Sequence, residues 1–335
     1  MQNLFLNLII FFFFISTFGY SGCNLDPSEE AEQRNLQKIL KEATCQLVVT
    51  YVIEAEKANG DKIYIGQDGN TAFREQSVKK PFYSAGTAVV MENGILGTAL
   101  HINPDRKTVG SAELASISTQ ISEESGTTAA TRFEANLQNA FLEHNLIHPD
   151  KGSWQLRRVN SFIILPQAPI ESIQGDLEKS PFKTPSGCFM TTPSLKNEER
   201  DIQVHFLPKK PKGIEGLRMD DIMNEEELSN LENIEDRQIF TYGYPASDIQ
   251  RQVISPQADL NRQITKLPDA TYEYIVTDLQ SYKGSSGSFV IHKQSGKVCG
   301  VVISKEQTNT SNVICSPAFV VRKLYDMALK SSPSE

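Results

Sequence analysis

Short apolar runs bounded by glycine, proline and polar residues recur along the chain, and they predict a protein built mainly of β-strands. The runs lie at residues 45–54, 84–90, 95–101, 159–166, 239–245 and 297–303. Helical spacing appears at residues 27–43, where Leu36, Ile39 and Leu40 share one face among charged residues. For the polar stretch 106–146 we expect strands and one helix around Phe133 to Leu146.

The first residues form a separate apolar segment. Residues 4–18 are apolar apart from Asn7, Ser16 and Thr17, a core too short for a membrane span. We therefore expect residues 1–22 to be a signal peptide, followed by an N-terminal helix and linker at 23–44. Cys23 follows Ser-Gly, which is similar to the end of a bacterial lipobox, so lipidation at Cys23 and plain cleavage are both open. The expected location is secreted or extracytoplasmic, with membrane contact only through a lipid on Cys23.

Composition restricts the classes of partner. The chain has 335 residues, a formal charge of −8 and 39% hydrophobic residues, as expected of a globular protein. The negative charge disfavours nucleic acid, which requires a basic face. No dinucleotide fingerprint, P-loop or paired metal-ligand motif occurs, so we expect no cofactor and no metal. We also expect a monomer.

The strongest candidate for chemistry is the turn from Gly284 to Ser288, with the sequence G-S-S-G-S, directly before an apolar strand. Glycines on both sides allow backbone conformations that present Ser286 as a nucleophile. The amides of Gly284 and Ser286 can then stabilise a developing oxyanion. An ordinary glycine-serine turn is the alternative.

A serine nucleophile needs a base, and His101 is the best placed of the five histidines. His101 ends the apolar run from Ile95 in the sequence T-A-L-H, whereas the others stand in polar stretches. A buried histidine with a structural role is the alternative.

Three segments together resemble the trypsin-like serine peptidases of the chymotrypsin fold, closest in style to bacterial glutamyl endopeptidases and HtrA-like members. They are the hairpin 84–101 with its T-A-L-H, the G-Y-P turn after residue 239, and the G-S-S-G-S turn followed by strand 297–303. The resemblance spans about residues 45–325. It implies an all-β fold of two six-stranded antiparallel barrels, at 45–172 with His101 and 173–335 with Ser286. An N-terminal helix and a surface insertion at about 196–237 complete it. It also implies a peptide or protein substrate.

One departure from the family concerns the aspartate that orients the histidine and begins a strand of the type D-[IL]-A-[LI]-[LIV]. We assign that strand to residues 159–166, where Ser161, or Asn160 in a shifted register, takes the aspartate's place. A carboxylate from elsewhere, such as Asp150, Glu143 or Asp176, can substitute, or Ser161 or Asn160 can support a slower dyad. The third interpretation is a catalytically weak or inactive peptidase-fold protein that acts as a binding module.

The resemblance also implies a specificity pocket. Its floor falls at Gln280 and its far wall at Ser304 and Lys305, a neutral residue beside a cation.

Apart from Cys23 the chain has four cysteines, an even number that suits disulfides in an oxidising compartment. The pairs we expect are Cys299 with Cys315 and Cys45 with Cys188. Buried free thiols are the alternative.

Overall fold

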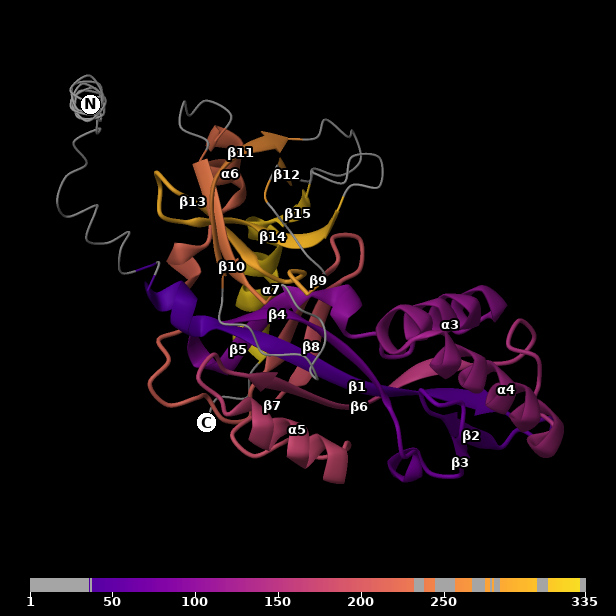
Figure 1. Ribbon diagram of the computed structural model, residues 1–335. Helices are drawn as coiled ribbons and strands as arrows, with labels where there is room; N and C mark the ends of the chain where they lie inside the picture. The colour runs from indigo at the N-terminus through magenta and orange to yellow at the C-terminus, as the bar shows by residue number, and fades with distance from the viewer. Residues whose placement is uncertain are drawn as a thin grey trace, which may run out of the picture.

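The computed structural model describes residues 36, 38–231, 238–244, 257–266, 275–277, 279, 284–305 and 313–331. These residues form two β lobes and a helical hairpin that stands beside the first lobe (Figure 1). The all-β class with two antiparallel lobes, predicted from the sequence, is confirmed.

The first lobe is a nine-stranded antiparallel sheet around β1. Its strands are β1 (Thr44–Glu56), β2 (Lys62–Ile65), β3 (Thr71–Ala72), β4 (Phe82–Val90), β5 (Ile95–Ala99), β6 (Gln155–Ile164), β7 (Phe189–Met190), β8 (Thr192–Asn197) and β9 (Ile202–Phe206). The order β3-β2-β1-β4-β5-β9-β8 is extended by β6, which pairs with both β1 and β7. β1 is long enough to pair with β4 through one half and with β2 through the other.

β7 and β8 are not paired with each other among the described residues, although only Thr191 separates them in the chain. The Thr191 amide donates a hydrogen bond to the Ser161 carbonyl of β6 at 2.8 Å. The first lobe is therefore an open sheet of nine strands, where the sequence predicted a barrel of six. Strands β7 to β9 follow residue 172 and yet pair in the first sheet, so the division expected at 172/173 falls before three of its strands.

The second lobe is a closed barrel of six strands in the order β10-β11-β12-β15-β14-β13, as predicted. The strands are β10 (Gln238–Gly243), β11 (Gln257–Lys266), β12 (Ile275–Thr277), β13 (Phe289–His292), β14 (Val298–Lys305) and β15 (Val313–Pro317). The predicted strand before the G-Y-P turn is β10, the first strand of this barrel.

Residues 106–146 form two helices instead of the expected strands and single helix. The helices are α3 (Ser111–Ser125) and α4 (Thr127–His144), joined at Gly126, whose φ of 89° suits glycine. Ile117 of α3 and Phe133 of α4 bury their side chains against Ile53 of β1 in a hydrophobic cluster of their own. The hairpin is thus held by packing against the half of β1 that lies beyond the first lobe's main core.

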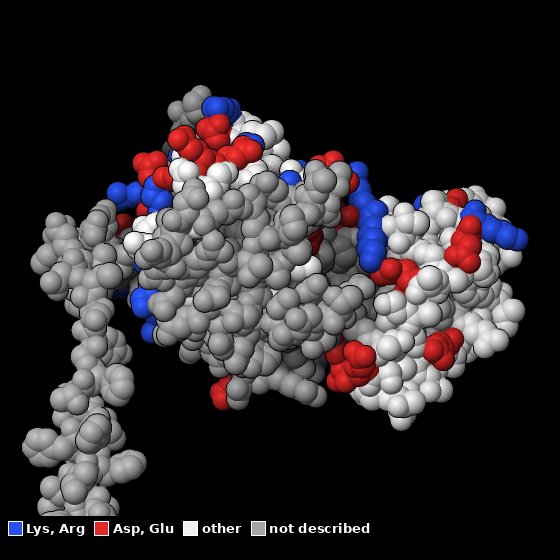
Figure 2. Space-filling model, turned by 90° about the horizontal axis from the view of Figure 1, so that it is seen from above, with Lys and Arg blue, Asp and Glu red and all other residues white. Residues whose placement is uncertain are grey.

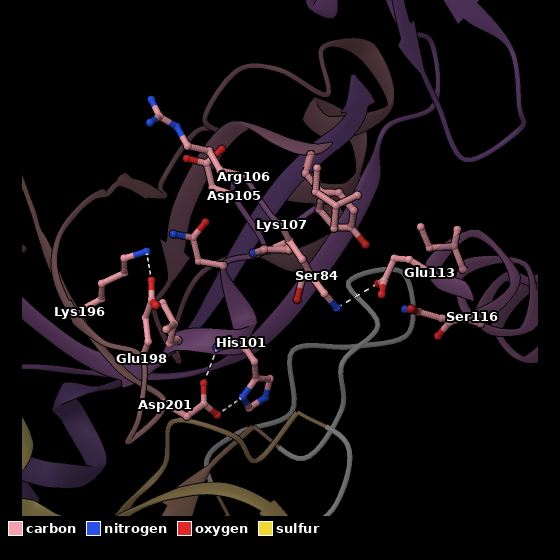
Figure 3. Close-up of a pocket in the computed structure, with 17 residues that line it drawn as sticks. Ser84, His101, Asp105, Arg106, Lys107, Glu113, Ser116, Lys196, Glu198 and Asp201 are labelled. Atoms are coloured by element: carbon pink, nitrogen blue, oxygen red, sulfur yellow. Dashed lines mark hydrogen bonds and ion pairs between the residues drawn. The ribbon is translucent and has the colours of Figure 1, made fainter. Parts of the chain in front are cut away.

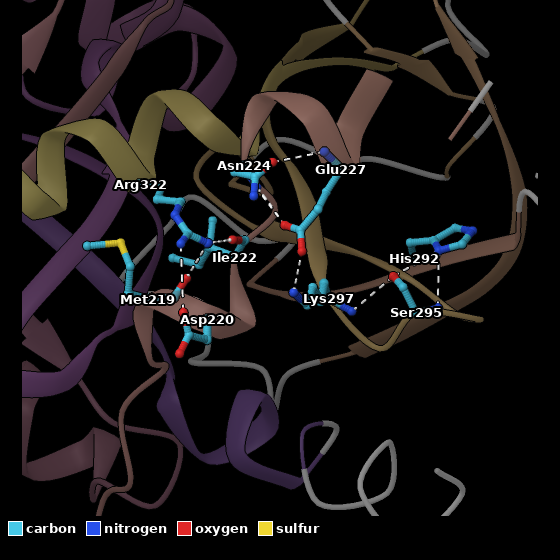
Figure 4. A network of polar contacts seen from close by, with 9 residues as sticks. All are labelled: Met219, Asp220, Ile222, Asn224, Glu227, His292, Ser295, Lys297 and Arg322. Carbon is cyan, nitrogen blue, oxygen red and sulfur yellow. Dashed lines mark hydrogen bonds and ion pairs between the residues drawn. The ribbon is translucent and has the colours of Figure 1, made fainter. Parts of the chain in front are cut away.

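The expected surface insertion at 196–237 contains part of the core. β9 lies within it, with Ile202 and Val204 fully buried. The acidic part continues through the 3-10 helix η4 (Met219–Asp221) into α6 (Glu225–Asn230). It is tied to the second lobe and to the C-terminal helix α7 (Ala318–Ser331), as Figure 4 shows.

The contacts run through three cations, Arg322, Lys297 and Lys323, the last of which pairs with Glu225 at 3.2 Å. Arg322 of α7 donates to the carbonyls of Met219 and Ile222, at 2.9 and 2.5 Å. Lys297 pairs with Glu227 at 2.5 Å. The acidic residues seen in sequence are therefore partly neutralised, and Figure 2 shows carboxylates and basic groups side by side on the face seen from above.

The N-terminal helix is described at residues 36 and 38–43, where Leu36, Ile39 and Leu40 are buried in the main core, the face predicted from their spacing. The expected signal peptide and Cys23 lie outside the described residues. Among the helices that the structure describes, none is long and apolar enough to cross a membrane. The first lobe also contains α5 (Ile170–Lys179) and the 3-10 helix η1 (Glu75–Ser77).

The expected disulfide between Cys299 and Cys315 is wrong, because both residues are free thiols. Pairing of β14 with β15 sets Cys315 opposite Val302, three residues along the strand from Cys299. Three residues of strand span about 10 Å, more than the Cα separation that a disulfide allows. The Cys299 thiol instead donates to the Val290 carbonyl at 3.4 Å.

The expected pair of Cys45 with Cys188 is wrong for a different reason. Cys45 points into the main core, where its thiol donates to the Ala88 carbonyl at 3.3 Å. Cys188 packs with Val48 of β1 in a cluster that contains neither Cys45 nor Leu47. Cys45 and Val48 are three residues apart on β1, so their side chains point to opposite faces of the strand. Cys188, which contacts the Val48 face, therefore lies on the other side of β1 from the Cys45 thiol.

Candidate active site

The hairpin of β4 and β5 places His101 at the edge of the first lobe. The strands join through η2 (Glu92–Gly94), where Asn93 has a φ of 61°, a left-handed conformation that asparagine tolerates. β5 ends at Ala99, and the tight turn η3 (Leu100–Ile102) follows. The side chain of His101 is 47% exposed, so its imidazole can be reached by a ligand.

Asp201 supplies the carboxylate that the sequence analysis did not find. The pairing of β5 with β9 sets Ala99 opposite Ile202, so the next positions, Leu100 and Asp201, also lie side by side. The Leu100 amide donates to the Asp201 carbonyl at 2.8 Å. Asp201 itself has a φ of 54°, which turns the chain sharply into β9.

The contact between His101 and Asp201 has two points. His101 Nδ1 donates to Asp201 Oδ2 at 2.6 Å, and the His101 amide donates to Oδ1 of the same carboxylate at 2.9 Å (Figure 3). A proton held on Nδ1 leaves Nε2 free to accept one, the tautomer that a general base requires. The two bonds also fix the orientation of the ring, because both carboxylate oxygens are used.

The strand that carries Asp201 has a readable signal. Residues 201–206 spell D-I-Q-V-H-F, which fits the D-[IL]-x-[LIV] start of the family strand. Gln203 and His205 interrupt the apolar pattern of β9, whereas residues 162–165 form an unbroken apolar run. Residues 159–164 belong instead to β6, which lies between β1 and β7.

The turn that carries Ser286 contacts the first lobe at Thr87 of β4 through hydrogen bonds. The Thr87 amide donates to the Ser286 carbonyl at 2.7 Å, and Thr87 Oγ1 donates to the Gly284 carbonyl at 3.0 Å. Gly284 and Gly287 have φ values of 96° and 88°. A Cβ added at Gly287 would lie 1.9 Å from the Thr87 carbonyl oxygen, so the turn can approach this closely only because residue 287 is glycine.

Ser286 and the His101 turn meet over one residue, Gly86. A Cβ added to Gly86 would lie 2.3 Å from Ile102 Cδ1 and 3.1 Å from the Ser286 carbonyl oxygen. The Ser286 backbone of the second lobe and the turn that carries His101 in the first lobe therefore both pack against Gly86. Among the described contacts, no hydrogen bond joins the Ser286 hydroxyl to His101, and such bonds are often long before substrate binds.

The backbone of the Ser286 turn leaves two amides for an oxyanion. The carbonyls of Gly284 and Ser286 are occupied by Thr87, and the Ser288 amide donates to the Ser285 carbonyl at 3.0 Å. In the part of the chain that the structure describes, no residue accepts a hydrogen bond from the amide of Gly284 or Ser286. An oxyanion hole requires amides that have no acceptor within the protein, so these contacts are compatible with the role expected of the two amides.

The other candidates for the third catalytic group lie elsewhere. Asp150 accepts hydrogen bonds from the amide and hydroxyl of Ser111, both at 2.7 Å, at the start of α3. These bonds lower the pKa of the Asp150 carboxyl. Asn160 pairs with Thr50 in the sheet. The structure therefore does not bring Asp150 or Asn160 to His101, whose Nδ1 is taken by Asp201.

Ser161, the remaining candidate, belongs to a buried polar network. Its hydroxyl lies 2.8 Å from Thr191 Oγ1, which in turn lies 3.2 Å from His205 Nδ1. His205 Nε2 meets Gln203 Oε1 at 3.1 Å, and Asn103 Nδ2 donates to the same oxygen at 3.0 Å. The network links β6 through β9 to the turn that follows His101, so Ser161 has a structural position behind the site.

The expected specificity pocket is only partly described. Gln280 lies outside the described residues, and Ser304 and Lys305 are described as backbone at the end of β14. Among the described residues, no three or more His, Cys, Asp or Glu side chains lie together in a way that could hold a metal ion.

The described residues thus form two antiparallel β lobes, with the His101–Asp201 pair in the first and Ser286 in the second, an arrangement that matches a chymotrypsin-like β fold. Solved structures to which the chain is similar include the active form of the Rv3671c protease from M. tuberculosis, at 12% identity and a TM-score of 0.43, covering 92% of this chain and 88% of that one. The HtrA-type protease AlgW with a decapeptide has 13% identity and a TM-score of 0.46, covering 89% and 68%. The serine endoprotease from Yersinia pestis has 8% identity and a TM-score of 0.45, covering 89% of this chain and 67% of that one. No family model and no curated protein matches the chain.

Proposed function

We propose that this protein is a serine endopeptidase in which Ser286 is the nucleophile, His101 the general base and Asp201 the group that orients the histidine. The observation that carries the proposal is the two-point contact of Asp201 with His101, through Nδ1 and through the backbone amide. The sequence analysis identified no aspartate in this role, and for that reason it considered an inactive binding module. The Asp201 carboxylate beside His101 removes that reason.

The chemistry follows from these positions. Ser286 Oγ attacks the carbonyl carbon of the scissile peptide bond while His101 Nε2 takes its proton, and the amides of Gly284 and Ser286 stabilise the resulting oxyanion. The C–N bond then breaks as His101 returns the proton to the leaving amine. Water attacks the acyl-enzyme with His101 as base, which releases the acid and restores Ser286.

The test is labelling with a fluorophosphonate, which reacts with activated serines, followed by mass spectrometry of the labelled peptide. Folded wild-type protein should carry the label on Ser286, and Ser286→Ala and His101→Ala should carry none. Folded wild type without label would contradict the proposal and restore the binding-module interpretation.

We further propose that the protein is exported and acts on peptides or proteins outside the cytoplasm as a monomer. The support is the apolar segment at residues 4–18. Expression of the full chain in a bacterium, followed by fractionation and intact-mass measurement, tests this. A mature mass beginning at Cys23 with added acyl chains indicates lipidation, cleavage without acyl chains indicates secretion, and an uncleaved chain in the cytoplasm contradicts export.

A further inference from the structure

Thr87 bonds to the turn at residues 284–288, called here the nucleophile turn, through both its backbone and its side chain. Figure 1 shows β4 at the base of the second lobe, and Thr87 of this strand is completely buried. Its amide donates to the Ser286 carbonyl at 2.7 Å, and its hydroxyl donates to the Gly284 carbonyl at 3.0 Å. One residue of the first lobe therefore fixes two carbonyls of the second.

The Thr87 hydroxyl has a defined direction. Its oxygen accepts a hydrogen bond from the Tyr244 amide at 2.9 Å, and its proton goes to the Gly284 carbonyl. A hydroxyl has one proton to donate, and a buried polar group that loses its partner is destabilising. The arrangement satisfies the Tyr244 donor and the Gly284 acceptor at the same time, so the contact with Gly284 is a fixed part of the structure.

The space around this hydroxyl is closed. A Cβ added to Gly243, the residue before Tyr244, would lie 3.2 Å from Thr87 Oγ1 and 2.1 Å from Ser288 Oγ. A water molecule needs more room than this, so it could not take over the hydrogen bonds of a missing hydroxyl.

The contact matters for Gly284 because glycine restricts its own backbone less than any other residue. The φ of Gly284 is 96°, and the bond from Thr87 to its carbonyl fixes the other dihedral angle. The next carbonyl, that of Ser285, accepts from the Ser288 amide at 3.0 Å. Since the peptide bond is planar, this second contact sets the direction of the Ser286 amide. The amides of Gly284 and Ser286 are thus oriented before any substrate binds, as stabilisation of an oxyanion requires.

A further hydrogen bond joins Thr87 to the strand that leads to His101. The Thr98 hydroxyl of β5 donates to the Thr87 carbonyl at 2.7 Å, and Thr98 is completely buried. Thr98 lies three residues before His101 in the chain. Thr87 therefore contacts both the nucleophile turn and the strand that ends at the expected base.

We propose that Thr87 is a positioning residue of the active site. Its hydroxyl fixes Gly284 so that the amides of Gly284 and Ser286 are aligned for the oxyanion, and its carbonyl ties this turn to the strand of His101. Thr87 itself does not reach the reacting atoms and acts through the two amides. The proposal rests on the proposed peptidase function, because the alignment serves a reaction at Ser286.

The test measures the rate of fluorophosphonate labelling of Ser286, at increasing reagent concentration, in wild type, Thr87→Val and Thr87→Ser. Valine has nearly the shape of threonine and lacks the hydroxyl, whereas serine keeps it. We expect the limiting rate to fall about tenfold or more in Thr87→Val, because the charge that the two amides stabilise develops only in the transition state. The half-saturating concentration should change little, and Thr87→Ser should keep most of the wild-type rate.

Thr44→Val is the matched control. The Thr44 hydroxyl is also completely buried and donates to a backbone carbonyl, that of Leu40, at 2.7 Å. None of its described contacts involves the nucleophile turn, so Thr44→Val should lose some stability and keep the labelling rate. A purely structural role of Thr87 predicts equal labelling of the two valine variants. Circular dichroism checks that each variant is folded, and Thr87→Ala carries the same prediction if Thr87→Val does not fold.

Hydrogen exchange separates the positioning role from the peptidase function. The amides of Gly287 and Ser288 donate to carbonyls of the second lobe at 2.7 and 3.0 Å, so their exchange reports on the turn without any reagent. Faster exchange in Thr87→Val than in Thr44→Val, with no labelling of folded wild type, would support the positioning role and contradict the peptidase function.

Two other outcomes would overturn the positioning role. If wild type is labelled and Thr87→Val is labelled at the same rate, or Thr87→Ser is as slow as Thr87→Val, the peptidase function stands and the role of the hydroxyl is refuted. If wild type is not labelled and exchange is equal in Thr87→Val and Thr44→Val, both proposals are contradicted.

Discussion

His205 makes the stability of the protein depend on pH in a way that can be calculated. Its side chain is completely buried, and this burial, with a smaller effect from Arg158, lowers its pKa from 6.5 to about 3. The neutral ring suits its contacts with Gln203 Oε1 and Thr191 Oγ1. The folded protein must therefore hold His205 without a proton at pH values where the unfolded chain takes one up.

The direction of the pH effect follows from the linkage between protonation and unfolding. Because the pKa of His205 is lower in the folded protein than in the unfolded chain, the stabilisation by neutral His205 is complete above pH 6.5. It is lost as the pH falls toward 3. Between pH 7 and pH 5 the unfolded chain becomes almost fully protonated at this residue and the folded one does not. The expected loss is about 2 kcal/mol in the free energy of unfolding.

The assay is urea unfolding of wild type and His205→Gln at pH 7 and pH 5, followed by far-UV circular dichroism. Glutamine does not titrate, so the variant should lack about 2 kcal/mol of the loss that wild type shows. Every other side chain is the same in the two proteins, so contributions other than that of residue 205 cancel in the comparison. Equal pH dependence in the two proteins would refute the assignment of His205 as a buried neutral group.

Three further predictions concern the site and the cysteines. Gly287→Ala should destabilise the protein and abolish fluorophosphonate labelling, because the new Cβ would lie 1.9 Å from the Thr87 carbonyl oxygen. The control is Gly126→Ala, which has nearly the same φ but open space around it and should keep labelling. Equal effects of the two substitutions would refute the close approach of Gly287 to Thr87. Gly86→Ala should also reduce labelling, since its Cβ would push against Ile102 and the Ser286 backbone, and labelling at the wild-type rate would show that these segments do not meet there. Cys45, Cys188, Cys299 and Cys315 should all react with a thiol reagent after unfolding without reductant, and the melting temperature should not change with dithiothreitol; fewer reactive thiols would mean that a disulfide forms.

Two local motifs could be recognised in the sequence because they depend on neighbouring residues. The G-S-S-G-S turn directly precedes β13, and the T-A-L-H motif spans the end of β5 and the turn after it. Asp201 was missed because the identity of β9 depends on distant partners. Gln203 and His205 interrupt its apolar pattern, and they are tolerated in the core because they bond to each other and to Asn103 and Thr191.

The wrong predictions for the position of the orienting aspartate and for the disulfides have a similar cause. The sequence analysis placed the aspartate's strand before residue 172, but α3, α4 and β6 to β8 lie in the chain between His101 and Asp201. Cysteine count suggested disulfides, and only the register of β14 with β15 shows that Cys299 and Cys315 are too far along their strands to pair. Pairing register is set by packing across whole lobes, which short motifs do not contain.

The role of Asp201 is the central claim, and one comparison tests it directly. The rate of fluorophosphonate labelling of Ser286 would be measured in wild type, in Asp201→Asn and in Asp150→Asn, with circular dichroism to confirm that each is folded. In chymotrypsin, asparagine in place of the orienting aspartate lowers kcat by about 10⁴. We predict a loss of labelling rate of at least a hundredfold in Asp201→Asn and a wild-type rate in Asp150→Asn. Labelling of folded Asp201→Asn at the wild-type rate, or a comparable loss in Asp150→Asn alone, would contradict the account.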